Sequence, residues 1–340
     1  MSVLVTGAAG YIGSIVSEKL IEEGCGVVGL DNLSRGHRAA LDGRVAFIQA
    51  DLGDEAALEK VFAENDIEAV MHFAAYAWVG ESMTDPAGYF RNNVACGINL
   101  LNVMVGHGVK KLVFSSSCAV YGEPGKIPID ENCDQRPANP YGETKLIFEK
   151  MLPWYRQAYG LSSISLRYFN AAGASLLHGE DHTPETHLIP NVLKAAAGEA
   201  DGLSVFGADY ATVDGTCVRD YIHVLDIARA HVMALRRLDD SPQCQAYNIG
   251  NGAGYSILQV IEAAGRVCGV KIPYTVAQRR PGDPATLIAD HNLITAGLGW
   301  KPQYPALETI IQDAWQWRIK HPHGYGGSKG ARGQEYAKHL

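Results

Sequence analysis

Three glycines lie between the first apolar run of the chain and the helical pattern that follows it. The run Ser2–Thr6 has the length and the side chains of a buried strand. Gly7, Gly10 and Gly13 come directly after it, in the spacing G-x-x-G-x-x-G. Such glycines permit a tight turn, a close approach of the backbone to a pyrophosphate and close packing of helix on strand. Because the first amides of a helix bind phosphates, the pattern predicts a dinucleotide-binding turn; a tight turn without a ligand is the alternative.

Short apolar runs then alternate with longer amphipathic runs through the first half of the chain. The candidate strands are Ser2–Thr6, Val27–Leu30, Val45–Gln49, Ala69–Phe73, Leu112–Ser115 and Ser163–Leu166. The candidate helices are Ile12–Glu23, Glu55–Asn65, Ala95–His107 and Tyr141–Tyr159. This alternation is typical of a parallel sheet with crossover helices on both faces. We therefore predict an α/β fold with a Rossmann-type, doubly wound parallel sheet over residues 1–167.

The rhythm changes after Arg167, where loops rich in glycine, proline, histidine and acidic residues take over. Asp220–Leu235 has the pattern of a strand start followed by a helix, and Ala246–Ile249 that of a strand able to rejoin the sheet. We expect residues 168–340 to form mainly a smaller C-terminal α/β domain that binds the substrate, with parts of 220–250 returning to the first domain. The tail after Pro322 is basic and glycine-rich, so we expect it to be loosely held.

Acidic residues outnumber basic ones, 37 against 29, which gives a formal charge of −8. Because no run of lysine or arginine offsets this balance, we expect neither nucleic acid nor an anionic membrane as a partner. No apolar stretch reaches the roughly 18 residues of a membrane span. The sequence runs directly into its first predicted strand, so we expect no secretory leader, and its seven cysteines are scattered. We therefore expect a cytoplasmic protein without a disulfide framework.

A carboxylate ends the second predicted strand. Asp31 stands where it can bind both hydroxyls of an adenosine ribose and repel a 2′-phosphate, which favours NAD over NADP. Arg35, four residues later, is the one counter-signal. Asp51 and Leu52 follow the third strand, where a contact with the edge of the adenine is expected. Capping of the next helix by Asp51 is an equally good alternative.

A tyrosine and a lysine four residues apart give the sharper chemical signal. On a helix, Tyr141 and Lys145 share one face, so the phenol and the ammonium can converge. A free phenol has a pKa of about 10. The Lys145 ammonium and the positive nicotinamide ring are expected to stabilise the phenolate, which makes Tyr141 a usable general base. Ser117, at the end of the fifth strand, is placed to hydrogen-bond the same oxygen. An exposed helix face is the alternative for this pair alone.

These motifs and their order resemble the extended short-chain dehydrogenase/reductase family, and more closely its UDP-glucose (UDP-galactose) 4-epimerases. The matching stretches are TGAAGYIGS, DNLSRG, HFAA, VGES, YFRNNV, SSSCAVYGEP, NPYGETK, LRYFNAAGA, THLIP, YNIGNG and RRPGDPA. The resemblance implies reversible C4 epimerisation of UDP-glucose and UDP-galactose through a 4-keto intermediate, with hydride transfer to tightly held NAD and back. It also implies that the C-terminal domain binds the UDP-sugar and that two long helices per subunit build a homodimer.

The resemblance also assigns residues to each ligand. For NAD it implies Gly7, Gly10, Tyr11, Ile12, Gly13, Asp31, Asn32, Asp51, Leu52, Phe73, Ala74, Asn92, Tyr141, Lys145 and Tyr168. For the UDP-sugar it implies the catalytic Ser117, the phosphate ligands Asn170, Arg219 and Arg280, the uridine-side residues His187, Leu188 and Phe206, the ribose ligand Asp283 and the sugar-pocket residue Leu287.

The chain departs from the family pattern at two positions. Ala77 stands in a segment where many epimerases carry a lysine, so one cation near the cofactor is missing there. Leu287 stands where the family gates its sugar pocket with a bulky tyrosine or a small residue. The size of Leu287 leaves the tolerance of N-acetylated sugars open.

Three histidines in one polar loop invite a metal interpretation. His178, His182 and His187 lack the spacing of a zinc motif. We therefore expect solvated loop histidines and no metal site, with His187 near the uridine.

Other reactions stay open beside the epimerase hypothesis. A sugar-nucleotide 4,6-dehydratase would share the opening oxidation, but such relatives carry an Asp-Glu pair directly after the strand-end serine or threonine. Cys118 and Ala119 occupy those positions here, which counts against dehydration. An NAD-binding sensor without catalysis would typically lack Tyr141 or Lys145. Epimerisation of UDP-xylose and UDP-arabinose, or of UDP-GlcNAc and UDP-GalNAc, is a further alternative.

Overall fold

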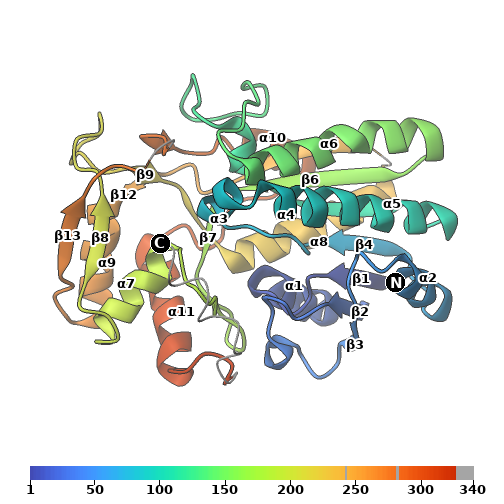
Figure 1. The fold of residues 1–340 in the computed structure, drawn as a ribbon, viewed down its shortest axis with the longest axis horizontal. Helices are drawn as coiled ribbons and strands as arrows, with labels where there is room; N and C mark the ends of the chain where they lie inside the picture. The colour runs from blue at the N-terminus through green and yellow to red at the C-terminus, as the bar shows by residue number, and fades with distance from the viewer. Residues whose placement is uncertain (242, 281–282, 327–340) are drawn as a thin grey trace.

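The computed structural model describes residues 1–241, 243–280 and 283–326. Its larger lobe contains a seven-stranded sheet in the order β11-β6-β5-β4-β1-β2-β3, with every neighbouring pair parallel (Figure 1). The strands are β1 (Ser2–Thr6), β2 (Gly26–Asp31), β3 (Ala46–Gln49), β4 (Ala69–His72), β5 (Lys111–Ser117), β6 (Ser162–Tyr168) and β11 (Cys244–Ile249). The order reverses between β1 and β4, and ligands of such sheets bind at the strand ends there. The predicted doubly wound α/β fold is confirmed.

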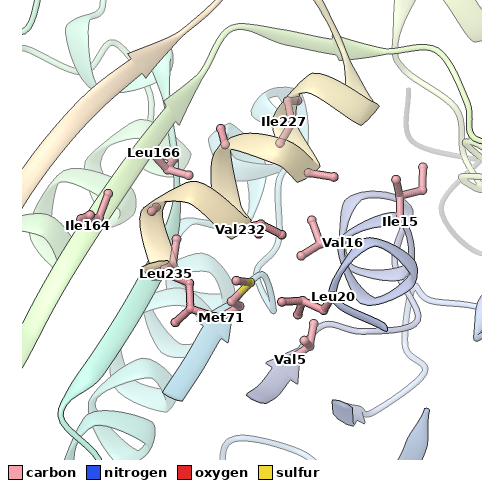
Figure 2. Packing of buried hydrophobic residues seen from close by; sticks show 14 of the residues in the cluster. Val5, Ile15, Val16, Leu20, Met71, Ile164, Leu166, Ile227, Val232 and Leu235 are labelled. Carbon is pink, nitrogen blue, oxygen red and sulfur yellow. The ribbon is translucent and has the colours of Figure 1, made fainter. Parts of the chain in front are cut away.

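Helices cover both faces of this sheet. The first face carries α1 (Tyr11–Glu22) and α8 (Val224–Asp240), and the second carries α2 (Glu55–Glu64), α5 (Cys96–Gly106) and α6 (Pro140–Tyr159). Because successive strand residues point to opposite faces, Val5 belongs to the first core and Leu4 to the second. Figure 2 shows Val16 and Leu20 of α1 meeting Val232 of α8 beside Met71 of β4.

The connection between β4 and β5 contains more helix than the sequence pattern predicted. Two short helices, α3 (Val79–Thr84) and α4 (Pro86–Phe90), precede a π-helical turn at Arg91–Ala95 that leads directly into α5. The side chain of Asp85 caps α4 by accepting from the Gly88 amide at 2.9 Å. Helices this short show too few periods for a hydrophobic pattern to reveal them. Single π-helical turns often mark functional sites.

The smaller lobe lies at the left of Figure 1. Its strands are β8 (Leu203–Phe206), β9 (Val218–Arg219), β12 (Tyr255–Ser256), β13 (Tyr274–Ala277) and β14 (Thr286–Leu287). Its helices are α7 (Leu188–Ala196), α9 (Ile257–Cys268) and α11 (Leu307–Lys320), which share one apolar core. Near the junction, β7 (Asn170–Ala172) pairs in parallel with β10 (Tyr221–His223), and α10 (Asn292–Leu298) packs on the larger lobe.

Part of the second half of the chain returns to the larger lobe. α8 follows β10 and packs on the sheet, and β11 pairs in parallel with β6, so the strand predicted at Ala246–Ile249 is present and two residues longer. The tail is better anchored at its start than the composition suggested, because the Tyr325 amide donates to Asp181 at 2.9 Å. The rest of the tail, 327–340, lies outside the described residues. Within the described ranges, no helix has the length and apolar character needed to cross a bilayer.

Candidate active site

The glycine turn after β1 is shaped by close backbone contacts. Gly7 has φ +71°, and a Cβ there would lie 2.6 Å from the amide nitrogen of Ala74. A Cβ on Gly13 would collide with the carbonyl of Gly7, so the start of α1 packs directly on the turn. Gly10 is the N-cap residue of α1, and it has no side chain that could accept a hydrogen bond from the first amides of the helix. The amides of Tyr11 and Ile12 therefore begin a helix that can accept a phosphate, and the turn suits a dinucleotide.

The Asp31 carboxylate ties the end of β2 to this turn. Its Oδ2 accepts from the Ala9 amide at 3.0 Å and its Oδ1 accepts from the Leu33 amide at 2.8 Å. Burial raises the pKa of Asp31, and these two bonds oppose that shift. The carboxylate thus stands beside the turn, where the sequence placed a ribose ligand.

Asn32 joins Asp31 to the end of β3. The Asn32 amide donates to Asp51 Oδ2 at 2.6 Å, and Asp51 Oδ1 accepts from the Gly53 amide at 2.7 Å. The alternative that Asp51 caps the next helix is wrong, because Asp54 accepts from the Ala57 amide and caps α2. Leu52 is buried in the core beneath.

The segment after β4 contacts both the glycine turn and α6. Ala74 lies against Gly7, as described above, and Phe73 precedes it. Asn92 donates to Asn93 Oδ1 at 2.9 Å. The buried Asn93, which the sequence pattern did not single out, accepts from the Tyr76 amide at 2.8 Å. Its own amide donates to the Tyr76 carbonyl at 2.9 Å and to Thr144 Oγ1 at 3.0 Å.

Ser117, Tyr141 and Lys145 gather at the carboxyl end of β5. Ser117 ends β5, and α6 begins at Pro140 because Asn139 caps it by accepting from the Gly142 amide at 2.9 Å. The Ser117 side chain hydrogen-bonds Tyr141. Lys145 Nζ donates to the Ser115 carbonyl at 2.7 Å and lies 5.9 Å from the centre of the Tyr141 ring. The predicted triad is therefore assembled in space.

The ionisation of this triad differs from the expectation for Lys145. Burial raises the pKa of Tyr141 to about 12, although the Ser117 hydrogen bond lowers it. Burial also lowers the pKa of Lys145 to about 7, with the Glu149 carboxylate opposing that shift. The Lys145 ammonium is engaged by the Ser115 carbonyl and lies 5.9 Å from the centre of the Tyr141 ring.

Tyr168 ends the neighbouring strand β6, and Asn170 begins β7. Tyr168 is the register partner of Ser117, so it stands beside the triad. Its hydroxyl and His231 Nε2 are 2.6 Å apart. The Asn170 amide donates to the Asp220 carbonyl at 3.0 Å. Both residues lie at the edge where the sequence placed them.

Three of the predicted substrate residues also meet near Ser117. Arg219 donates to the carboxylate of Asp283 and, at 2.8 Å, to the Val218 carbonyl. Leu287 is the register partner of Arg219, and Leu287 and Cys118 pack against the same apolar cluster. Burial raises the pKa of the Cys118 thiol to about 12, and the charge of Arg219 opposes that shift. The substrate side of the site therefore adjoins the triad.

Asp220, which the sequence pattern did not single out, holds this region together. Its Oδ1 accepts from the Asn251 amide at 2.8 Å, and its Oδ2 accepts from the Gly252 amide at 2.9 Å and the Ala289 amide at 3.1 Å. Burial raises the pKa of Asp220 to about 7, and these bonds oppose that shift. Its place directly after Arg219 is the only local signal for this role.

The remaining predicted substrate residues lie in the smaller lobe. Phe206 ends β8, and the guanidinium carbon of Arg280 lies 4.0 Å from the centre of its ring. Leu188 begins α7 and packs on the core of this lobe. His187 precedes α7, and no described contact joins these four residues to the triad.

One histidine of the loop, His178, is not solvated as expected, whereas His187 is exposed. His178 is buried, and among the described residues its ring nitrogens find no hydrogen-bond partner. His187 Nδ1 lies 2.7 Å from Glu180 and 2.9 Å from Glu185, and these carboxylates raise the pKa of His187 although burial lowers it. His182 joins the same cluster, whose ligand atoms lie within 4.8 Å of one another. Ion pairing of histidine with carboxylate accounts for this spacing.

Comparisons with known proteins agree with this geometry. The NAD dependent epimerase/dehydratase family matches residues 3–250. The UDP-glucose 4-epimerase of Halalkalibacterium halodurans is 50% identical over 327 residues, 96% of this chain and 98% of that protein. The UDP-glucose 4-epimerase from Brucella ovis, solved in complex with NAD, has a TM-score of 0.90 and 47% identity, covering 93% of this chain and 97% of that one. The enzyme from Bifidobacterium longum, in complex with NAD⁺ and UDP, has a TM-score of 0.90 and 40% identity, covering 95% and 100%. This chain therefore belongs to the NAD dependent epimerase/dehydratase family, among its UDP-glucose 4-epimerases.

Proposed function

We propose that the chain interconverts UDP-glucose and UDP-galactose at C4, with Tyr141 as the group that takes and returns the proton of the 4-hydroxyl. The observation that carries the proposal is the meeting of Ser117, at the end of β5, with Tyr141 and Lys145, in the first turns of α6. When bound at the glycine turn, NAD supplies the acceptor and donor of the C4 hydride. The side chains of the protein hold the sugar and move the proton.

Ser117 favours the charged form of Tyr141. Its hydrogen bond lowers the pKa of Tyr141, in the direction opposite to burial. A hydrogen bond that stabilises the phenolate makes the oxygen a better proton acceptor. The buried Lys145 holds the carbonyl of Ser115, two residues before Ser117, and so orders the end of β5 against α6. We assign Lys145 this positioning role besides its contribution to the cofactor site.

The site has little capacity for dehydration. Elimination across C5 and C6 needs an acid and a base near the sugar, and Cys118 and Ala119 occupy the positions after Ser117. Because burial raises the pKa of Cys118 to about 12, its thiol neither donates nor accepts a proton readily at neutral pH. The alanine has no ionisable group. These residues favour epimerisation.

The function is tested by incubating the purified protein with UDP-galactose and no added NAD, and following the sugar by NMR. We expect UDP-glucose to form, because a cofactor restored in each cycle need not dissociate. Denaturing the same sample should release NAD rather than NADP, since the Asp31 carboxylate stands beside the turn. A 4-keto-6-deoxy product would indicate a dehydratase, and no conversion of any UDP-hexose would contradict the proposal.

Replacing Arg219 by Ala should raise KM for every UDP-sugar by a similar factor. A hydrogen bond to a charged group contributes about 1.5–3 kcal/mol, or roughly 10- to 150-fold in KM. Arg279→Ala is the matched control, because that arginine pairs with Asp209 at 2.6 Å instead. Initial rates with UDP-glucose and UDP-GlcNAc check the prediction. Loss of only one of these sugars would move Arg219 from the diphosphate into the sugar pocket.

We also propose a homodimer in the cytoplasm. α5 and α6 cover the same face of the sheet, and α6 exposes Trp154 to 69% and Tyr159 to 52%. The seven cysteines are all free, which suits a reducing compartment.

The dimer surface is tested with Trp154→Glu. We expect multi-angle light scattering to give twice the subunit mass of 36.7 kDa for the wild type and a shift towards the subunit mass for the variant. A buried charge without a partner disfavours association. An unchanged dimer in the folded variant would place the interface elsewhere.

A further inference from the structure

Three side chains that follow β4 hold Arg35, and a fourth, Tyr89, supports one of them. Its guanidinium carbon lies 4.2 Å from the centre of the Tyr76 ring and 3.9 Å from that of Trp78. Its Nη2 donates to the two carboxylate oxygens of Glu81 at 2.8 and 2.7 Å. Tyr89 in turn donates to Glu81 at 2.8 Å. We call Arg35 with these four residues the Arg35 clamp.

The sheet order fixes where the Arg35 clamp lies. Arg35 follows β2, whereas Tyr76, Trp78 and Glu81 follow β4. β1 lies between β2 and β4, so any contact between residues after those two strands crosses the carboxyl end of β1. The glycine turn occupies that end. Both connected segments also touch the turn, because the His37 amide donates to the Ala9 carbonyl at 2.9 Å and Ala74 lies against Gly7.

One nitrogen of Arg35, Nη1, makes none of the hydrogen bonds within the Arg35 clamp. Nη1 is buried and, within the described part of the chain, has no hydrogen-bond acceptor. A buried charged donor without an acceptor is costly, and such donors in native structures call for a ligand, a water or an ion. The ligand that belongs at the carboxyl end of β1 is the diphosphate of a dinucleotide, which is an anion.

We propose that Arg35 is a cofactor-binding residue whose Nη1 donates to the NAD diphosphate, and that its ion pair with Glu81 closes the two segments across the bound cofactor. Arginine suits this task because its planar group can pair with a carboxylate and a phosphate at once. In the sequence, Ala77 stands between Tyr76 and Trp78 and carries no charge. Arg35 therefore supplies a positive charge to this segment. The proposal rests on NAD binding and not on which sugar is epimerised.

The position of Arg35 also bears on the choice between NAD and NADP, for which this arginine was the one signal in favour of NADP. A 2′-phosphate would extend from the ribose at Asp31, on the β2 side of the turn. The guanidinium of Arg35 is instead stacked between rings that follow β4. Arg35 thus faces the diphosphate and not the ribose.

The test measures how fast the purified holoprotein loses its nucleotide. Wild type, Arg35→Met and Arg38→Met are dialysed, and NAD per subunit is determined by chromatography after denaturation. Arg38 is the matched control, because it stacks on Phe47 at 4.0 Å in the same connection and outside the clamp. We expect Arg35→Met to lose NAD roughly 10- to 100-fold faster than the other two proteins, with turnover restored by excess NAD.

Three outcomes would overturn the proposal. Equal NAD loss from Arg35→Met and wild type would exclude the contact, and a selective loss of NADP affinity in Arg35→Met would make Arg35 a 2′-phosphate ligand. If Arg35→Met does not fold, Glu81→Gln opens the clamp and keeps the arginine, and unchanged NAD loss from that variant would exclude the closure. A wild type that holds and binds no NAD would contradict the proposed function instead, which separates the two failures.

Discussion

Replacing Tyr141 by Phe is expected to lower kcat with UDP-galactose roughly 10²- to 10⁴-fold, the usual contribution of a positioned general base. The substitution keeps the ring and removes only the oxygen that Ser117 hydrogen-bonds. The bond from Lys145 to the Ser115 carbonyl does not involve that oxygen. NAD content and UDP affinity should therefore stay near those of the wild type while turnover falls.

Tyr155→Phe is the matched control for this loss. Tyr155 belongs to the same helix, and its hydroxyl donates to Asn102 at 2.8 Å, far along the chain from the triad. We expect its turnover to stay within a few-fold of wild type. NAD content, UDP binding by calorimetry and kcat are measured in all three proteins. If Tyr141→Phe keeps turnover within a few-fold of wild type, another group moves the proton.

Much of the fold could be predicted because its signals are local. The strand β1 was predicted with its observed bounds, since four buried positions in a row are followed at once by the glycine turn. α6 was predicted within one residue, because Pro140 starts it and Gly160 ends it with φ +72°. The parallel sheet with helices on both faces followed from the alternation of strand and helix.

The parts of the site that could not be predicted depend on residues far apart in the sequence. Arg35 and Glu81 are separated by 46 positions, and only the sheet order brings their segments together. Asn93 sits in a π-helical turn whose register no periodic pattern reveals. Arg219 and Asp283 were both expected at the substrate, but their mutual ion pair joins β9 to the segment before β14, which lies far along the chain.

Electrostatics gave the least predictable result. The spacing of Tyr141 and Lys145 is visible in the sequence, and their depth is not. Burial raises the pKa of Tyr141 to about 12 and lowers that of Lys145 to about 7. The helical spacing shows which side chains share a face, whereas the surrounding packing decides how much burial shifts their pKa values.

The size of residue 287 is expected to set which UDP-sugars turn over well. Leu287 is the register partner of Arg219, and it packs against the same apolar cluster as Cys118, the residue after Ser117. A clash or contact of methyl size changes a rate by roughly 10- to 200-fold, about 1–3 kcal/mol. Leucine is smaller than tyrosine and larger than serine, so we expect UDP-glucose and UDP-galactose to be preferred over the N-acetylated pair.

Two substitutions at Leu287 test this expectation in opposite directions. Leu287→Tyr should suppress activity with UDP-GlcNAc and spare the simple hexoses, whereas Leu287→Ser should raise it by enlarging the pocket. The measurement is kcat/KM for UDP-GlcNAc divided by kcat/KM for UDP-glucose. Ile288→Val is the control, because Ile288 follows β14 and its side chain lies against Gly254. A ratio that stays constant across Leu287 and both variants would mean that this side chain does not face C2 of the sugar, and that selectivity is set from another strand.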